Sequence, residues 1–321
     1  MMRKTAGLST YVAVADQAGK QIGLYDLDVR PWDASRALVW RWSADPCNGF
    51  EGLMDAWGLP TDAKLRRCDR WDGQWMVVTD SLGLAAIVNY PAGNERRWGL
   101  NVGGNPHSAE LLPDGNIAVA ASTGGWVRVY TSSQGKDAET YAEYAFPGAH
   151  GVEWDAKRQV LWAVGEDRLV ALEVYGNADA PRIRQVHQVR LPTSGGHDLQ
   201  PVYGCEDRLW VSTQAKVYQY SISMDQFDED YPECKRINRA HVKSVGDTPS
   251  GLVLSVTPDG VLRPDTGAAD NDWCTDSIDC CPNVGSSFET AAQSLVRYSL
   301  PGVALYKARV WLFTTSITIH K

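Results

Sequence analysis

Short runs of alternating apolar and polar residues, separated by tight turns, recur along this sequence and limit the folds open to it. Paired runs such as WMVVTD with LAAIVNYP, and NIAVAAS with WVRVYTS, are rich in Val, Trp, Tyr and Ile and are joined by Gly, Asp or Ser. Period-two alternation with this composition is typical of β-hairpins. Another short strand precedes each pair, and a fourth candidate strand follows it; the fourth strand is weakest in the unit that begins at His197, where it is expected near CKRINRA (234–240). The chain therefore repeats a unit of four strands.

The length of the repeat identifies the architecture. The first strands of successive units begin at Lys64, His107, His150 and His197, at intervals of 43, 43 and 47 residues. Four antiparallel strands in roughly 40 to 50 residues form one blade of a β-propeller. Two further units open at Lys243 and Lys307, which gives six blades in all.

The two ends of the sequence are predicted to share one blade. Few strands remain after Lys307, whereas residues 11–44 hold three strands that no inner strand precedes. Pairing these N-terminal strands with the C-terminal strand removes the open edges of a linear array. We therefore expect an all-β chain with a single domain over 1–321, a six-bladed propeller of four-stranded blades. An insertion at about 258–283 explains the longer interval before Lys307.

Composition limits the partners. The 321 residues carry a formal net charge of −8, and an acidic protein without basic runs is a poor binder of nucleic acid or anionic membranes. No apolar stretch is long enough for a transmembrane helix. We expect a monomer that binds neither nucleic acid nor membrane. The start, MMRKTAGLSTYVAVAD, lacks the apolar region of a secretory signal. The compartment stays open: extracellular if a signal peptide has been removed, otherwise cytoplasmic.

The seven cysteines leave their pairing open. Three of them crowd into WCTDSIDCCPN, a stretch without the paired CxxC spacing of a zinc site. A disulfide or free thiols are therefore favoured over a metal site in this segment. The three are Cys274, Cys280 and Cys281.

The register of the repeats predicts a polar ring at one mouth of the central channel. The first strand of each propeller blade lines the channel, so the residues that open these six strands should lie at the same height. Histidines open three consecutive first strands and lysines open the other three. The expected ring is His107, His150, His197, Lys243, Lys307 and Lys64.

The histidine side of this ring suits two kinds of chemistry. Three converging imidazoles can bind a divalent metal (Mn, Zn, Fe or Ca) and leave positions open for water and substrate. Without a metal, they can act as general acids or bases near neutral pH. Glu110, Glu153 and Gln200 lie three residues beyond the histidines and are candidates to orient the imidazoles. Strand alternation equally allows these three side chains to point elsewhere.

The lysine side predicts an anionic ligand. Arg66 and Arg309 lie two residues beyond Lys64 and Lys307, which would extend a cationic half-ring suited to a carboxylate, phosphate or sulfate. Alternatively, these cations pair with nearby acids, such as Asp62, Asp198 and Asp247.

Other residues complete the candidate set. His241 becomes the ring member if the alignment slips by two residues, and Tyr306 is a neighbouring phenol. The candidate catalytic residues are His107, His150, His197, Lys64, Lys243, Lys307 and Tyr306, and the candidate substrate-binding residues are Arg66, Arg309, Glu110, Glu153, Gln200 and His241.

A resemblance supports the fold. The runs PHSAELLPDGNIAVAASTGGWVRVY, GAHGVEWD, GGHDLQPV, VKSVG and YKARVW, with DAKLRR before them, resemble an uncharacterised microbial and fungal family of propeller proteins, a domain of unknown function. The resemblance covers nearly the whole chain except the Cys-rich insertion, and it implies the propeller fold without an activity. Histidines beside cationic residues are also similar in placement to propeller polysaccharide lyases, some of which bind a metal through histidines and cleave uronate-containing sugars. No lyase motif matches residue by residue.

These observations favour one function among three. The chain has no GxxxxGK[ST], GxSxG or HExxH motif, which disfavours nucleotide-driven chemistry, a serine hydrolase and a zincin. The main hypothesis is an enzyme of the lyase or hydrolase type acting on an anionic small molecule or acidic saccharide at the channel mouth. The alternative is a non-catalytic scaffold that binds a protein or glycan. A metal-dependent oxygenase or isomerase would share the histidines but prefer an apolar tunnel.

Overall fold

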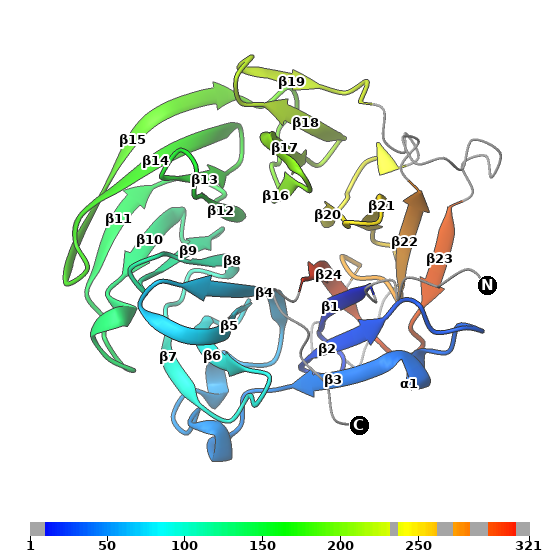
Figure 1. Ribbon diagram of the computed structural model, residues 1–321, viewed down its shortest axis with the longest axis horizontal. Helices are drawn as coiled ribbons and strands as arrows, with labels where there is room; N and C mark the ends of the chain where they lie inside the picture. Colours follow the sequence, from blue (N-terminus) through cyan, green and yellow to red (C-terminus); the bar gives the residue numbers. More distant parts are fainter. Residues whose placement is uncertain (1–9, 232–236, 262–271, 283–294, 313–321) are drawn as a thin grey trace, which may run out of the picture.

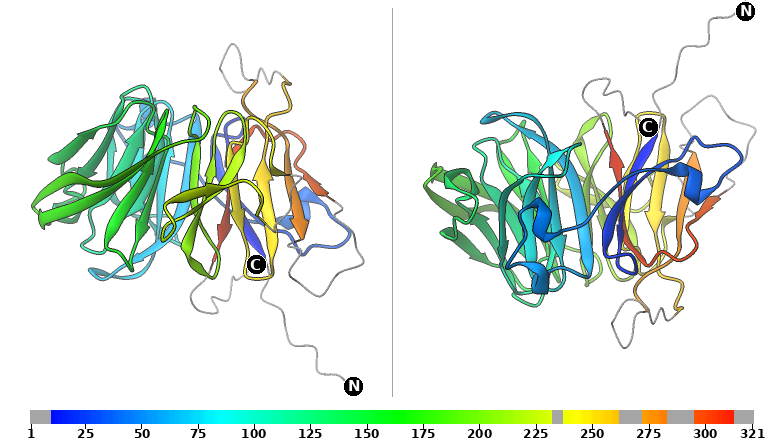
Figure 2. Two further views of the ribbon diagram at one scale, coloured as in Figure 1. Left: turned by 90° about the horizontal axis from the view of Figure 1, so that it is seen from above. Right: turned by 90° about the horizontal axis from the view of Figure 1, so that it is seen from below.

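Six four-stranded antiparallel sheets surround a central axis, as predicted (Figure 1). The computed structural model describes residues 10–231, 237–261, 272–282 and 295–312. Seen from the side, the sheets stand next to one another around the axis (Figure 2). No helix in these ranges is long and apolar enough to cross a membrane.

The first three blades follow one another along the chain, each running from the axis to the rim. Blade 1 is β4 (Pro60–Cys68), β5 (Trp71–Asp80), β6 (Leu84–Tyr90) and β7 (Arg96–Asn101); blade 2 is β8 (Pro106–Leu111), β9 (Ile117–Ala121), β10 (Trp126–Tyr130) and β11 (Tyr141–Ala145); blade 3 is β12 (Gly151–Asp155), β13 (Val160–Val164), β14 (Arg168–Asn177) and β15 (Ala180–Arg190).

The last three blades include the one that closes the ring. Blade 4 is β16 (Asp198–Val202), β17 (Cys205–Ser212), β18 (Val217–Ser221) and β19 (Gln226–Asp228); blade 5 is β20 (Ser244–Asp247), β21 (Leu252–Val256), β22 (Ser277–Pro282) and β23 (Val296–Ser299); blade 6 is β24 (Leu305–Trp311), β1 (Tyr11–Asp16), β2 (Gln21–Asp26) and β3 (Leu38–Trp42).

The closure of the ring confirms the prediction for the two ends. β24 pairs antiparallel with β1, with Val12 opposite Val310, and β1 to β3 supply the outer part of blade 6. The helical turns that are bounded within the described ranges are short: α1 (Ala34–Ala37), η1 (Pro46–Asn48), η2 (Met54–Ala56) and η3 (Ser132–Gln134).

Apolar side chains fill the space between neighbouring blades. Trp98 is fully buried between blades 1 and 2, Trp210 between blades 4 and 5, and Trp311 between blades 6 and 1. Burial of large aromatic side chains makes these contacts the main source of stability. On the first strands, the side chains that face a neighbouring blade are thus apolar. The side chains that face the axis are polar and form the candidate site.

Two details of the strand prediction were wrong. A weak fourth strand of blade 4 was expected near residues 234–240, but Gln226–Asp228 forms that strand, and residues 232–236 lie outside the described ranges. The insertion was expected over 258–283, but its end is β22. The Cys-rich run forms a strand because Cys280 and Cys281 are fully buried and β22 pairs with both β21 and β23. Residues 262–271 also lie outside the described ranges.

The cysteines of this stretch differ in chemical state. Cys281 is disulfide-bonded, whereas Cys274 and Cys280 remain thiols. Burial raises the pKa of the Cys280 thiol well above its ordinary value. Cys280 is therefore a packed apolar side chain rather than a reactive thiolate.

Candidate functional site

A pocket of about 680 Å³ opens at one mouth of the central channel. Its volume lies in the range common for small-molecule sites. The pocket lies at the mouth because the first strand of each blade starts there, and the second strand returns the chain to the same end. At its base lie His107, His150, His197, Lys243 and Tyr306, which we call the mouth cluster.

The structure brings the three predicted histidines together. The rings of His107 and His150 are stacked, with centroids 4.5 Å apart and planes at 25°. The ring of His197 lies 4.7 Å from that of His150 and 6.3 Å from that of His107. His150 therefore lies between the other two imidazoles. His150 and His197 directly precede β12 and β16, and His107 is the second residue of β8.

Hydrogen bonds fix which nitrogens carry protons. His150 Nδ1 lies 2.7 Å from the Gly148 carbonyl, to which it donates, so its Nε2 carries the lone pair. His197 Nδ1 faces the Lys243 carbonyl at 3.3 Å, and its Nε2 accepts from Lys243 Nζ at 3.1 Å. Two neutral imidazoles with a defined lone pair result.

Tyr306 joins the outer two histidines. Its hydroxyl lies 3.0 Å from His107 Nδ1 and 3.2 Å from His197 Nε2. When His107 Nδ1–H donates to the Tyr306 hydroxyl, that hydroxyl shares the single lone pair of His197 Nε2 with the Lys243 ammonium. Burial raises the pKa of Tyr306 well above its ordinary value, so that it remains a phenol.

Burial also keeps the imidazoles neutral. It lowers the pKa of His150 to about 4, although the bond to Gly148 opposes the shift. Burial lowers the pKa of His107 and His197 well below the ordinary value, and neighbouring cations and histidines add to the effect. Lys243 is affected as well: burial and then the charge of Lys307 lower its pKa to about 8. At neutral pH the cluster holds three neutral rings and one ammonium group.

The three histidines do not form a metal site in this arrangement. Among the residues described, no group of three His, Cys, Asp or Glu side chains could hold a metal ion. The reason is visible in the geometry: His107 and His150 meet face to face rather than nitrogen to nitrogen. Two of the ring nitrogens that a metal would need are also bonded to Tyr306 and Lys243.

The predicted lysine half-ring was wrong. Only Lys243 lies at the mouth, and it is the one lysine or arginine that lines this pocket in the described part of the chain. β4 begins at Pro60 and the Thr61 hydroxyl bonds the Pro106 carbonyl. Lys64 therefore lies three residues, about 10 Å, deeper than the level of His107. In β24 the mouth position belongs to Tyr306, and Lys307 is the next residue inward.

Below the mouth, four cations and four carboxylates fill the channel. We call this set the axial ion network: Lys64, Arg66, Lys307, Arg309, Asp62, Glu110, Glu153 and Asp198.

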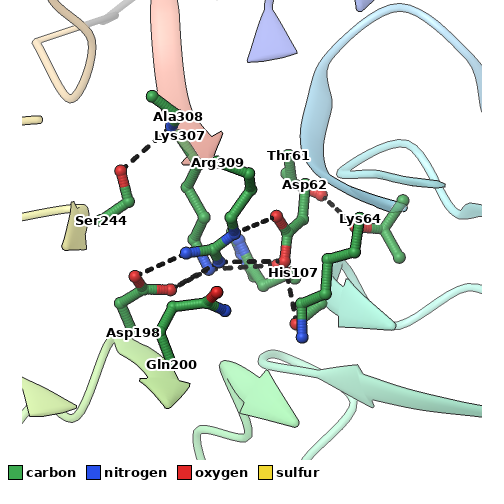
Figure 3. A network of polar contacts seen from close by, with 12 residues as sticks. Thr61, Asp62, Lys64, His107, Asp198, Gln200, Ser244, Lys307, Ala308 and Arg309 are labelled. Atoms are coloured by element: carbon green, nitrogen blue, oxygen red, sulfur yellow. Dashed lines mark hydrogen bonds and ion pairs between the residues drawn. The ribbon is translucent and has the colours of Figure 1, made fainter. Parts of the chain in front are cut away.

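Arg309 is the centre of the axial ion network. Its guanidinium bonds Asp62 at 2.7 and 3.0 Å and Asp198 at 2.6 and 2.7 Å (Figure 3). Burial alone would raise the pKa of both carboxyls, but Arg309 and Lys307 outweigh it and hold these pKa values below the ordinary range. The alternative that the cations pair with nearby acids is thus correct for Asp62 and Asp198. Asp247 instead accepts from the Tyr203 amide and the Trp210 indole.

Lys307 connects the axial ion network to the mouth cluster. Its fully buried Nζ lies 3.3 Å from Asp198 and donates to the carbonyls of His107 at 3.2 Å and His150 at 3.4 Å. Because these bonds hold the backbone beneath two imidazoles, Lys307 positions the histidines rather than meeting a ligand.

The three expected imidazole partners have other roles. Glu110 and Glu153 bind Lys64 and Arg66, and Gln200 donates to its own strand at Leu199. A separation of three residues along a strand spans about 10 Å, so these side chains lie deeper in the channel than the imidazoles. Glu153, Gln200, Arg66 and Arg309 reach a small pocket of about 120 Å³ at the opposite end.

The remaining residues of the main pocket come largely from one type of turn. His241 is at the rim, exposed and outside the cluster. Sequence reasoning missed the turns between second and third strands, which all return to this mouth. They contribute Gln17, Leu82, Ser122, Glu166, Thr213, Gln214 and Trp273.

The chain is similar in structure to several solved proteins, one of them over nearly its whole length. A crystal structure of a protein of unknown function from Bacteroides caccae aligns with a TM-score of 0.56 at 10% identity, covering 94% of this chain and 98% of that one. Hydrazine synthase from Kuenenia stuttgartiensis aligns at 0.49, 14% identity and 77% and 68% coverage. A streptogramin B lyase aligns at 0.47, 13% identity and 75% and 69% coverage.

The sequence comparisons separate family from function. No curated protein matches the chain. Residues 33–303, most of the sequence, match one family throughout. The protein therefore belongs to DUF6528, a family of unknown function.

Proposed function

We propose that the protein is an enzyme that binds a small anionic molecule at the channel mouth and cleaves it by acid–base chemistry of the lyase or hydrolase type. One observation carries the proposal: three neutral imidazoles, a phenol and a single ammonium group converge at the base of one pocket. A cluster of buried titratable groups in a concave site is typical of catalytic centres.

Lys243 is the anion-binding group of this proposal. Its ammonium lines the pocket, and its pKa of about 8 leaves it mainly charged at neutral pH. Glu166 is the one carboxylate that lines this pocket within the described ranges, and it is exposed at the rim. An anion that enters the mouth would thus meet a net positive charge at the bottom of the pocket. If its carboxylate pairs with Lys243, the hydrogen on the neighbouring carbon becomes more acidic.

His150 is the general base. The Gly148 carbonyl holds its Nδ1–H, so Nε2 carries the lone pair. In a lyase reaction Nε2 takes the proton from the carbon next to the carboxylate, and the electron pair of that C–H bond forms a carbon–carbon double bond. The leaving oxygen departs from the adjoining carbon and takes up a proton. Tyr306 is the candidate donor of that proton. In a hydrolase reaction Nε2 takes the proton of the attacking water.

The experiment is a screen of carboxylate-bearing substrates, including uronate oligosaccharides, monitored for unsaturated products and for new reducing ends. Activity found in the wild type is expected to fall at least a hundredfold in His150→Ala, the usual cost of losing a general base. His187→Ala is the matched control because His187 lies on outer strand β15, bonded to Tyr220 and Asp225.

Lys243→Met tests the anion-binding group. It is expected to raise KM for anionic substrates, while Lys157→Met, which changes an exposed lysine paired with Glu206, leaves KM unchanged. Saturable binding without product formation would overturn the catalytic proposal and establish a non-catalytic binding propeller. Turnover unaffected by His150→Ala would place the chemistry elsewhere.

A further inference from the structure

The pocket has one wall that the repeat pattern does not account for. In blades 1 to 4 and 6, a short turn joins the second strand to the third. In blade 5 the corresponding connection runs from the end of β21 at Val256 to the start of β22 at Ser277. This long connection places Trp273 in the lining of the pocket.

The Trp273 indole is fixed by its edge. Its Nε1 donates to Gln17 Oε1 at 3.1 Å, and Gln17, which is 1% exposed, donates in turn to the Pro60 carbonyl at 3.3 Å. The backbone next to the indole is fixed too, because Thr275 exchanges two hydrogen bonds with Leu305 on β24. The ring therefore has a defined orientation while remaining half-buried at the pocket wall.

Planar polar groups on two other turns also line the pocket. Gln17, which holds Trp273, belongs to blade 6, and Glu166 lies on the β13–β14 turn of blade 3, directly across a ring of six blades. Gln214 is on the β17–β18 turn of blade 4, which lies between blade 3 and blade 5, the blade whose connection carries Trp273. The side chains of Glu166 and Gln214 are exposed, so both are available to a ligand.

We propose that the ligand of this pocket is a cyclic sugar acid whose ring stacks on Trp273, whose carboxylate pairs with Lys243, and whose hydroxyls bond Glu166 and Gln214. An aromatic face that shares one pocket with a carboxylate and an amide suits a pyranose ring, which has C–H groups on its faces and hydroxyls at its edge. This inference rests on the proposed function and narrows its anion to a uronate-type ring.

The test compares ring-shaped and open-chain acids by isothermal titration calorimetry. The probes are digalacturonate, a glucuronate-containing disaccharide, malate as an acyclic acid, and digalactose as a neutral ring. At least one of the two uronates is expected to bind more tightly than malate. Digalactose is expected to bind more weakly than that uronate and more weakly than malate. Trp273→Ala should weaken the binding of that uronate about tenfold, which is the contribution of one aromatic contact. The affinity for malate should change less than twofold.

The controls separate stacking from folding. Trp273→Phe keeps an aromatic face and is expected to recover most of the uronate affinity. Tyr175→Ala removes an aromatic side chain that is 38% exposed on the outer hairpin of blade 3 and should change nothing. Unchanged malate binding shows that Trp273→Ala retains a folded mouth cluster.

The failures are distinguishable. Suppose that malate binds and that Lys243→Met abolishes this binding. If neither uronate then binds more tightly than malate, or if Trp273→Ala has no effect on uronate binding, this inference is overturned and the proposed anion site stands. If none of the acids binds, or if Lys243→Met leaves their binding intact, the proposed function itself is overturned.

Discussion

The buried guanidinium of Arg309 offers the sharpest test of how the channel is held together. Arg309 is 5% exposed, and Asp62 and Asp198 are 1% and 0% exposed. Replacing Arg309 with Met keeps much of the side-chain volume but leaves three cations for four carboxylates in the channel. A buried pair that loses one partner typically destabilises a protein by about 3–5 kcal/mol. We expect a decrease of this size in the free energy of unfolding at pH 7.

The destabilisation caused by Arg309→Met is expected to depend on pH in a defined direction. In the wild type the folded-state pKa values of Asp62 and Asp198 lie below the ordinary value. Their stabilising contribution is therefore complete above the unfolded-state pKa, about 4, and is lost as the pH falls through the lower folded-state values. Without Arg309, burial dominates and raises the pKa of one carboxyl, so that this carboxyl takes up a proton on folding. The difference between variant and wild type should then shrink as the pH falls from 7 to about 4.

Urea unfolding at several pH values measures both quantities. Arg184→Met is the matched control, since Arg184 is 61% exposed and pairs with Glu173 at the surface. Such a pair contributes about 0–1 kcal/mol. Adding Asp62→Asn to Arg309→Met should restore part of the lost stability, because it removes the excess carboxylate. The charge-balance argument would be refuted if Arg309→Met lowered the free energy of unfolding by less than about 1 kcal/mol at pH 7. It would also be refuted if the decrease in this free energy did not become smaller in acid.

Two further predictions concern the mouth cluster. The profile of kcat/KM against pH should rise through about pH 4 as His150 loses its proton and fall through about pH 8 as Lys243 loses its own; activity that instead rises through pH 8 would make Lys243 the base. The stacked rings of His107 and His150 predict that Zn²⁺ and Mn²⁺ leave the melting temperature unchanged. A specific metal site would add about 2.7 kcal/mol at a hundredfold excess over its Kd, and loss of that gain in His150→Ala would show that the histidines do bind a metal.

The repeated strands and the closure of the ring could be predicted because both are encoded locally. Alternation of side chains has a period of two, and turn residues follow their own backbone preferences, so each hairpin is visible in its own segment. The positions of His107, His150 and His197 at the mouth follow from the same repeat. Their convergence needed only the blade period and the fact that first strands line a propeller axis.

The height of each cation in the channel could not be predicted in this way. β4 starts earlier relative to its neighbour than the repeat suggests, and its pairing with β5 shifts register between Pro60 and Asp62. Because β4 begins four residues before Lys64, Lys64 lies inside the channel and blade 1 places no lysine at the mouth. Likewise Tyr306, rather than Lys307, reaches the histidines because β24 begins at Leu305.

The number of blades, the strand order and the arc of histidines follow from the amino-acid pattern alone, because they depend on local alternation and a regular period. Which charges are neutralised and which remain for a ligand depends instead on contacts between strands that are far apart in the chain. Arg309 meets Asp62 and Asp198 across separations of 247 and 111 residues, and a buried charge must find a partner wherever the fold offers one. Lys64 and Lys307 are therefore paired within the axial ion network, and Lys243 remains as the cation that lines the main pocket among the residues described.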